Sequence, residues 1–128
     1  YGIVYNAKMS KKDDEEVAVK RNIVDTDLSF SGCLRELDLL NRLRGHPYIV
    51  KLHSISFGNP FIAPNSPIAD NKKGALREDY MHFIFEKADK NIHQLIYEKE
   101  IHVGYFKLAM VQILLGVEYM HAKGVIHR

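Results

Sequence analysis

The chain has 128 residues, of which 46% are hydrophobic and 27% charged, a composition typical of one folded domain or part of one. This composition excludes a disordered tail, a collagen-like chain and two independent cores. Lys and Arg together number 18 and Asp and Glu 16, and because these charges are interspersed, nucleic-acid binding is not indicated. We expect no membrane contact either, because no apolar run approaches the ~20 residues that span a bilayer.

Cys33 is the only cysteine, so the chain has no internal disulfide and no cysteine cluster for a structural zinc. We expect Cys33 to be a small buried helix residue, and the protein to be intracellular, in the cytoplasm or the nucleus. No metal site is predicted, because His121 and His127 have no carboxylate or cysteine to complete a ligand set. The sequence begins at Tyr1 and stops at Arg128 after an apolar stretch, and we interpret both ends as cuts.

The pattern of hydrophobic residues predicts an α+β architecture with mostly antiparallel strands, one helix among them, and a helical part after them. The expected elements are strands at 1–5 and 17–19, a helix at 28–43, strands at 49–57 and 81–85, and helices at 91–99 and 105–122. The charged run 11–16 is expected to form a hairpin turn. Residues 57–79 are polar and contain three prolines, and we interpret them as a long insertion that buries little apolar surface.

The helix predicted at 105–122 has a stripe of apolar residues at helical spacing: Phe106, Met110, Ile113, Val117 and Met120. We interpret this stripe as core packing. Gly124 is expected to end the helix as its C-terminal cap, and Val125 and Ile126 to begin another buried segment.

Lys20 ends an apolar strand and, by the two-residue period of strands, points to the same face as Ala18. Glu36 shares a helical face with the leucines three, four and seven residues further on. An unpaired buried carboxylate is costly, so a cation from a neighbouring strand would be its economical partner. The sequence therefore predicts an ion pair between Lys20 and Glu36. A lysine at a sheet edge and a solvated glutamate are the alternatives.

Five segments resemble, in order, motifs of the eukaryotic protein kinases. They are Tyr1-Gly2-Ile3-Val4-Tyr5, Val17-Ala18-Val19-Lys20, Leu34 to Leu37 with His46 to Val50, Phe83 to Glu86, and His127-Arg128. Residues 1–5 resemble the end of the glycine-rich loop, residues 17–20 the V-A-I-K strand, and residues 34–37 with 46–50 the C helix with its exit. Residues 83–86 resemble the strand that enters the hinge, and residues 127–128 the start of the H-R-D loop. The resemblance implies a partial kinase domain, with the small lobe at 1–85, the hinge at 86–90 and the start of the large lobe at 91–128.

Within that family the chain is similar to the cyclin-dependent serine/threonine kinases, a CMGC-like group. Phe30 to Leu37 resembles their P-S-T-A-I-R-E helix, and residues 1–5 match their Y-G-V-V-Y. The similarity implies a cyclin-like activator as a partner, although Phe30 and Gly32 depart from the motif where that helix meets a cyclin. Tyr1 matches the tyrosine that these kinases phosphorylate to inhibit themselves.

The resemblance also implies an ATP site. The residues that it assigns to ATP binding are Gly2, Val4, Ala18, Lys20, Phe85, Glu86, Ala88 and Asn91, and Lys20 and Glu36 are also assigned to catalysis. Gly2 would let the backbone approach phosphate, and Val4 and Ala18 would enclose the adenine. Lys20, positioned by Glu36, would hold the α- and β-phosphates.

The remaining assignments concern the far side of the nucleotide. The backbone of Glu86 and Ala88 would bind the adenine edge as the hinge, and Phe85 would guard the pocket behind it. Asn91 would meet the ribose. His127 would support the catalytic loop without acting as a base.

In the family, the catalytic Asp follows His-Arg, and the magnesium ligands are a later Asn and the Asp of D-F-G. None of these positions occurs within the 128 residues, so the isolated chain is expected to be inactive. The implied function of the parent is transfer of the γ-phosphoryl group of magnesium-bound ATP to a serine or threonine hydroxyl of a protein substrate. The alternative is a non-catalytic kinase-like module that binds nucleotide or a partner, and the residue after Arg128 would distinguish the two.

Overall fold

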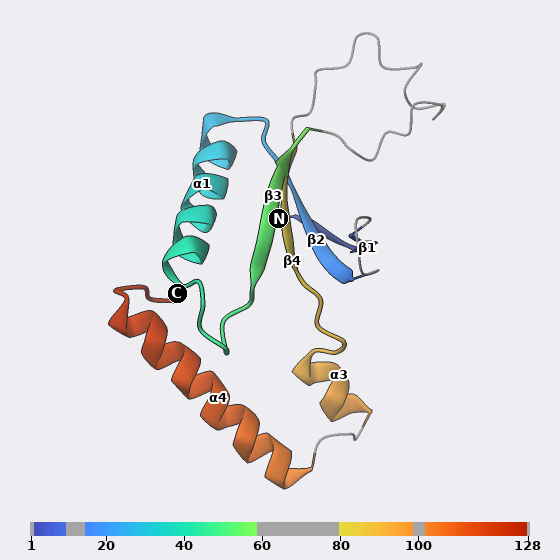
Figure 1. The fold of residues 1–128 in the computed structure, drawn as a ribbon, viewed down its shortest axis with the longest axis vertical. Coiled ribbons are helices and arrows are strands. Elements are labelled where there is room, and N and C mark those ends of the chain that lie inside the picture. Colours follow the sequence, from blue (N-terminus) through green and yellow to red (C-terminus); the bar gives the residue numbers. More distant parts are fainter. Residues whose placement is uncertain (1, 10–14, 59–79, 99–101, 128) are drawn as a thin grey trace.

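A computed structural model describes residues 2–9, 15–58, 80–98 and 102–127. Its elements are β1 (Ile3–Lys8), β2 (Glu16–Ile23), α1 (Asp27–Arg42), β3 (Leu52–Phe57), β4 (Tyr80–Glu86), α3 (Ile92–Tyr97) and α4 (Val103–Ala122). The predicted α+β class is confirmed, with α1 beside the sheet and the two later helices below it (Figure 1). Tyr1, Arg128 and residues 59–79 of the predicted insertion lie outside the described residues.

The described strands form one antiparallel sheet in the order β1-β2-β4-β3. The predicted pairing of the first two strands is confirmed, since β1 pairs with β2 from Ile3 opposite Arg21 to Lys8 opposite Glu16. Residues 11–14 of the predicted turn lie outside the described residues, and Glu16 already belongs to β2. The third strand begins later than predicted, at Leu52 instead of Ile49. The backbone N–H of Ile49 donates to the carbonyl of His46 at 3.2 Å, so the chain is still turning there.

Helix α1 begins at a capping box that the sequence analysis did not identify. The Thr26 hydroxyl accepts a hydrogen bond from the backbone N–H of Ser29, and the Ser29 hydroxyl accepts one from the backbone N–H of Thr26, both at 3.1 Å. Two of the backbone donors at this helix end are therefore satisfied locally. The cap fixes where α1 starts, and hence which of its residues face the sheet.

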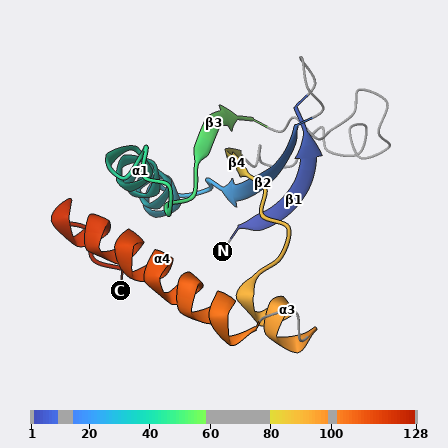
Figure 2. The ribbon, with the colours of Figure 1, turned by 60° about the horizontal axis from the view of Figure 1, so that its bottom comes forward.

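The core lies between α1 and one face of the sheet, which is seen along the helix axis in Figure 2. Met81 and Phe83 of β4 are fully buried and pack with Cys33 of α1. The partly buried apolar residues around them are Val24, Leu37, Leu40, Leu52 and Phe85. The prediction that Cys33 is a buried helix residue is confirmed.

Helix α4 approaches the rest of the chain through its C-terminal half. Its one buried residue, Gly116, lies so close to the chain at Tyr48 that an added Cβ would be 3.0 Å from the Tyr48 carbonyl oxygen. The rings of His46 and Tyr119 stack with their centroids 4.5 Å apart. Gly124, with φ of +70°, follows the helix as predicted.

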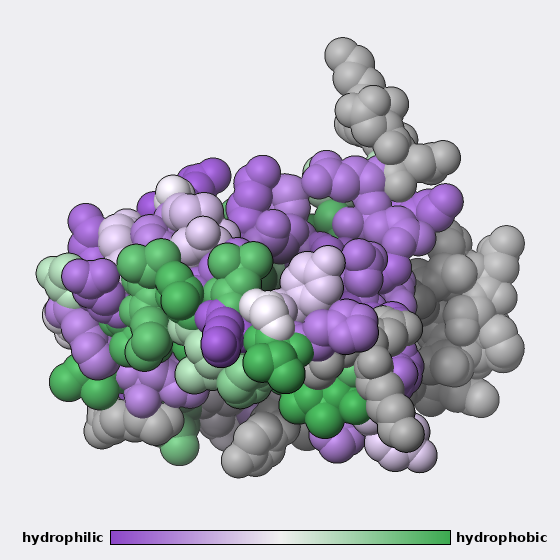
Figure 3. Space-filling model, turned by 90° about the horizontal axis from the view of Figure 1, so that it is seen from below, coloured by the Kyte–Doolittle hydropathy of each residue, from purple (hydrophilic) through white to green (hydrophobic). Residues whose placement is uncertain are grey.

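The prediction that the stripe on α4 is core packing is wrong for three of its five residues, whereas Val117 and Met120 are half-buried. Phe106, Met110 and Ile113 are all exposed, because no described element covers this side of the helix. Figure 3 looks onto the molecule from below, where apolar and polar residues alternate on the surface. By length and composition alone, α4 is a helix that could cross a membrane, contrary to our expectation that no apolar stretch is long enough.

Candidate functional site

The register of the sheet brings four of the predicted site residues, Val4, Ala18, Lys20 and Phe85, to one face. Lys20 of β2 lies opposite Val4 of β1 and Phe83 of β4, and Ala18 lies opposite Phe85. Directly paired residues of antiparallel strands point to the same side, and so do residues two apart on one strand. Val4, Ala18, Lys20, Phe83 and Phe85 therefore share the face of the sheet that α1 partly covers. We call it the inner face.

Lys20 and Glu36 form the predicted ion pair. The Lys20 Nζ lies 2.6 Å from Glu36 Oε1, and the two side chains retain 30% and 33% of their exposure. The same ammonium lies 6.0 Å from the centre of the Phe83 ring. Lys20 is therefore not a solvated lysine at a sheet edge, and Glu36 is not unpaired. A partly solvated pair of this kind contributes about 1 kcal/mol or less to folding.

The glycine at position 2 is required by packing. A Cβ added to Gly2 would lie 2.3 Å from Oδ1 of Asn22 and 2.7 Å from the carbonyl oxygen of Arg21, a clash with β2 that no small movement relieves. Val4, two residues on, has 61% of its surface exposed. The Val4 side chain, near the start of β1, is therefore an exposed apolar group at the edge of the inner face.

The connection that leaves β4 is attached to the sheet at two places. The Glu86 carboxylate accepts a hydrogen bond from the backbone N–H of Lys51 at 2.7 Å, and the backbone N–H of Glu86 donates to the Lys51 carbonyl at 3.0 Å. The next residue, Lys87, forms an ion pair with Glu16 at the start of β2. Sequence reasoning identified Glu86 for its backbone alone and missed the role of its side chain.

Two further predicted residues lie beyond β4. Ala88 is exposed, and Asn91 is the N-terminal cap of α3, where its side chain accepts a hydrogen bond from the backbone N–H of Gln94 at 2.8 Å. The side-chain Oδ1 of Asn91 is thus committed to the helix, a local reason for this residue type that is separate from nucleotide binding. Lys90, just before it, lies 2.5 Å from Glu98.

The charges around the site shift two side-chain pKa values. The hydrogen bond and the charge of Lys87 lower the pKa of the Glu16 carboxyl. Burial raises the pKa of the Cys33 thiol, and the neighbouring Glu36 carboxylate raises it further. Cys33 is therefore a neutral packing residue beside the ion pair and not a nucleophile.

A cavity of about 660 Å³ adjoins Glu36 on the inner side of α1. Leu40 and Leu43 line it from α1, and Met120 and His127 line it from the end of α4 and the segment after it. His127, which resembles the first residue of the catalytic loop motif, is thereby brought to the same cavity as Glu36. The order of motifs along the chain gave no indication of this proximity.

The sequence profile of the family described as "Protein kinase domain" matches residues 1–128. Mitogen-activated protein kinase 2 of Arabidopsis thaliana is 28% identical over 134 residues, and extracellular signal-regulated kinase 2 of Dictyostelium discoideum is 31% identical over 137 residues. A sporulation-specific mitogen-activated protein kinase of Saccharomyces cerevisiae is 30% identical over 131 residues. Each alignment covers 100% of this chain but only 30% or 31% of the relative, so the chain spans less than a third of their length.

Proposed function

This chain belongs to the protein kinase family, and on that premise we propose that the protein transfers the γ-phosphoryl group of ATP to a serine or threonine hydroxyl of a protein substrate. The observation that supports the proposal most directly is the contact of 2.6 Å between Lys20 and Glu36. The relatives are named as kinases, and no finding favours the non-catalytic alternative.

The described residues fit a bound nucleotide. Ala18 is small and half-buried, Val4 is open to solvent, and both share the inner face with the ammonium of Lys20. This arrangement offers an apolar surface to the flat base of a nucleotide and a cation to the phosphates of the same nucleotide. Bound ATP would supply the phosphoryl group, and bound magnesium would neutralise phosphate charge, with magnesium ligands that the family motif places after His-Arg.

Lys20 and Glu36 have separate tasks in this proposal. Lys20 binds phosphate oxygens and neutralises part of their charge, an interaction that favours transfer when the cation is already positioned. Glu36 is a positioning residue, because its carboxylate holds Lys20 Nζ in place and its helix packs on the sheet through Cys33. Removal of the Glu36 carboxylate should therefore reduce phosphoryl transfer less than removal of the Lys20 ammonium.

We further propose that residues 1–85 form the small lobe, 86–90 the hinge and 91–128 the start of the large lobe. The attachment of Glu86 to Lys51 supports a fixed start of the hinge, because the backbone that would bind the adenine edge is held against β3. Phe85 points to the inner face, as its assignment behind the adenine requires. In this scheme Gly2 contributes through its backbone, and Asn91 contributes as the N-terminal cap of α3.

The partners that we propose are ATP and a protein substrate, in an intracellular compartment that keeps Cys33 reduced. The relatives matched here are named as mitogen-activated protein kinases, which gives no support to a cyclin-like activator. The similarity to the wider CMGC group is confirmed by the same relatives.

The test is phosphoryl transfer by the full-length protein, measured with radiolabelled ATP and a generic protein substrate. Lys20→Met keeps the apolar stem and should abolish most transfer, whereas Glu36→Gln should reduce it less. Lys8→Met, at an exposed position of the neighbouring strand, is the matched control and should leave transfer unchanged. Near-normal turnover of Lys20→Met would refute the assignment, and nucleotide binding without transfer by the unaltered protein would favour the non-catalytic module.

A further inference from the structure

The side of the sheet opposite the inner face carries a cation that the proposed nucleotide site does not use. The register that places Lys20 on the inner face places Arg21 on the other side, which we call the outer face. Ile3 of β1 and His82 of β4 lie opposite Arg21 and share this face. No described helix covers it, because α1 packs on the inner face and α3 and α4 lie below the sheet (Figure 1).

The Arg21 guanidinium is held between two tyrosine rings. Its central carbon lies 4.7 Å from the centre of the Tyr80 ring and 5.1 Å from the centre of the Tyr5 ring. Tyr80 is only 7% exposed, and Tyr5 and Arg21 are half-buried. Ring contacts of this kind stabilise the cation without pairing its N–H donors with an oxygen acceptor. The two rings therefore position the guanidinium and leave its donors to another group.

No described carboxylate neutralises Arg21. In the part of the chain that the structure describes, Arg21 forms no ion pair and no side-chain hydrogen bond. The titratable side chain opposite it is His82; burial lowers the pKa of that imidazole, and the charge of Arg21 lowers it further. His82 therefore brings no negative charge to the outer face. A positioned guanidinium with uncompensated charge is suited to bind an oxyanion.

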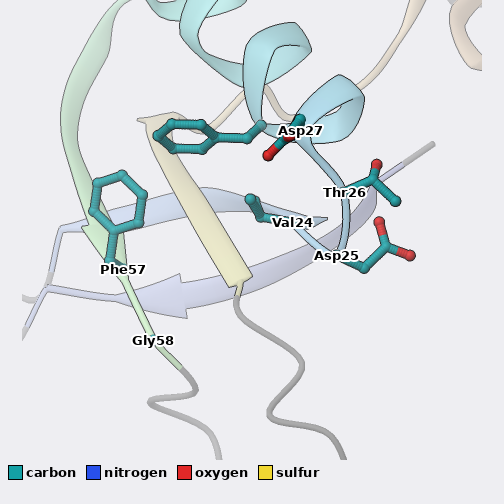
Figure 4. A pocket seen from close by; sticks show the side chains of 7 residues that line it. Val24, Asp25, Thr26, Asp27, Phe57 and Gly58 are labelled. Atoms are coloured by element: carbon teal, nitrogen blue, oxygen red, sulfur yellow. The ribbon is translucent and has the colours of Figure 1, made fainter.

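Two exposed isoleucines lie beside this cation. Ile3 has 55% of its surface exposed, and Ile23, two residues after Arg21 on β2 and opposite Tyr80, has 48%. Val24 comes next and points away from this face, into a hollow at the start of α1 (Figure 4). Single exposed apolar residues are common, but two beside a positioned cation form a surface with a specific chemical complement.

We propose that the outer face around Arg21 docks an acidic segment of a partner protein, with a Glu or Asp carboxylate on the guanidinium and apolar side chains against Ile3 and Ile23. A guanidinium matches one carboxylate through two parallel hydrogen bonds. Arg21 is the one Lys or Arg among the described strand residues that the pairing places on this face, so a doubly charged phosphate would lack a second cation. The apolar contacts supply area, and the charge selects the partner.

The experiment measures binding of the full-length protein to fluorescent peptide pools that differ at one central residue in a random background. The central residue is Glu, Gln, Lys or phosphoserine, with Leu two positions before and after it, because an extended segment presents alternate residues to one side. We expect the Glu pool to bind about tenfold more tightly than the Gln pool, and the Lys pool to bind least. Added salt should reduce these differences.

Three variants and one control locate the binding. Arg21→Gln should make the Glu and Gln pools bind equally, and Arg21→Lys should retain part of the preference, because it keeps the charge without the planar pair of donors. Ile23→Ser should weaken both pools by a similar factor. Arg44→Gln, which removes an exposed arginine outside the sheet, should change nothing. Urea unfolding checks the fold of each variant, and the pools compared on the unaltered protein require no variant to fold.

Four results would overturn the proposal. Equal binding of the Glu and Gln pools by the unaltered protein would remove the acidic partner, and an undiminished preference for Glu in Arg21→Gln would place the site elsewhere. Tightest binding of the phosphoserine pool would identify the ligand as phosphate. Self-association that sedimentation detects and that Arg21→Gln abolishes would make the occupant a second copy of this chain.

Discussion

Glu86 and Lys51 are joined by two hydrogen bonds that run in opposite directions: the Lys51 backbone N–H donates to the Glu86 carboxylate at 2.7 Å, and the Glu86 backbone N–H donates to the Lys51 carbonyl at 3.0 Å. Lys51 precedes β3 by one residue, and Glu86 is the last residue of β4. The side chain thus extends the sheet pairing beyond the regular strands. This contact fixes the end of β4, where the proposed hinge begins.

Replacing Glu86 with alanine removes the acceptor for the Lys51 N–H. We expect the free energy of unfolding to fall by about 1 kcal/mol, the usual net value of one hydrogen bond, and the KM for ATP of the full-length protein to rise. Glu86→Gln retains an acceptor oxygen and should show a smaller effect on both. Urea unfolding and steady-state kinetics are the measurements, with Glu118→Ala, at an exposed position of α4, as the control. A KM for ATP that is unchanged in Glu86→Ala would show that the contact does not position the hinge.

The ion pair of Lys20 and Glu36 should matter little for stability. About a third of each side chain is exposed, so Lys20→Met should change the free energy of unfolding by about 1 kcal/mol or less. Urea unfolding of the same preparation that is used for the activity assay separates the two effects. Destabilisation far above that value would mean that the loss of transfer reflects unfolding.

The pKa of Glu16 should depend on Lys87. Lys87 lowers the pKa of the Glu16 carboxyl in the folded protein, so the folded state releases this proton at a lower pH than the unfolded chain does. The pair therefore adds stability above the unfolded pKa of the carboxyl, and this stability is lost as the pH falls through the folded pKa. Carbon-detected NMR titration of Glu16 should show its pKa rise towards 4.5 in Lys87→Met. An identical titration curve in the two proteins would contradict the assigned cause.

Cys33 should resist modification in the folded protein. The residue is 6% exposed, and burial raises the pKa of its thiol, so both access and thiolate content are low. Labelling with a thiol reagent at pH 8 should proceed only through unfolding, at a rate that rises with added urea. Rapid labelling in the absence of denaturant would show that α1 separates from the sheet readily.

His82 should make the folded protein sensitive to mild acid. The residue is 1% exposed, and burial lowers its pKa below the usual 6.5, although a hydrogen bond with the Ser56 backbone partly opposes the shift. Below about pH 6.5 the unfolded chain binds a proton that the folded state does not, so stability decreases as the pH falls. Urea midpoints at pH 7.5 and 5.5 should differ less for His82→Gln than for the unaltered protein. Equal differences would assign the acid sensitivity to other groups.

The sequence predicted the ion pair because two independent periodicities agree. The two-residue period of β2 placed Lys20 on the face with Ala18, and the helical period of α1 placed Glu36 on the apolar side that faces the sheet. The hairpin of β1 and β2 was likewise predictable, since it joins neighbouring segments. In these cases local spacing determines both the element and the side that each residue faces.

Other features are contacts between segments that lie far apart in the chain, and the spacing of residues within one element does not predict such contacts. The pairing of β2 with β4 and the contact of Glu86 with Lys51 join segments that are remote in the chain. The apolar stripe of α4 was identified correctly, but periodicity shows which side of a helix is apolar and not what covers it. The capping box of α1 was missed because Ser29 stands where the common signature has Glu or Gln.

The strand order also determines when the site forms during folding. The pairing of β2 with β1 closes a short segment, whereas its pairing with β4 must wait until α1 and β3 have been brought back to the sheet. Such non-local pairing closes a longer loop and is the slower event. Lys20, Glu36 and Phe85 lie on β2, α1 and β4, so no locally folded part contains all three. The capacity to bind nucleotide should therefore appear in the last kinetic phase of refolding, together with the complete sheet.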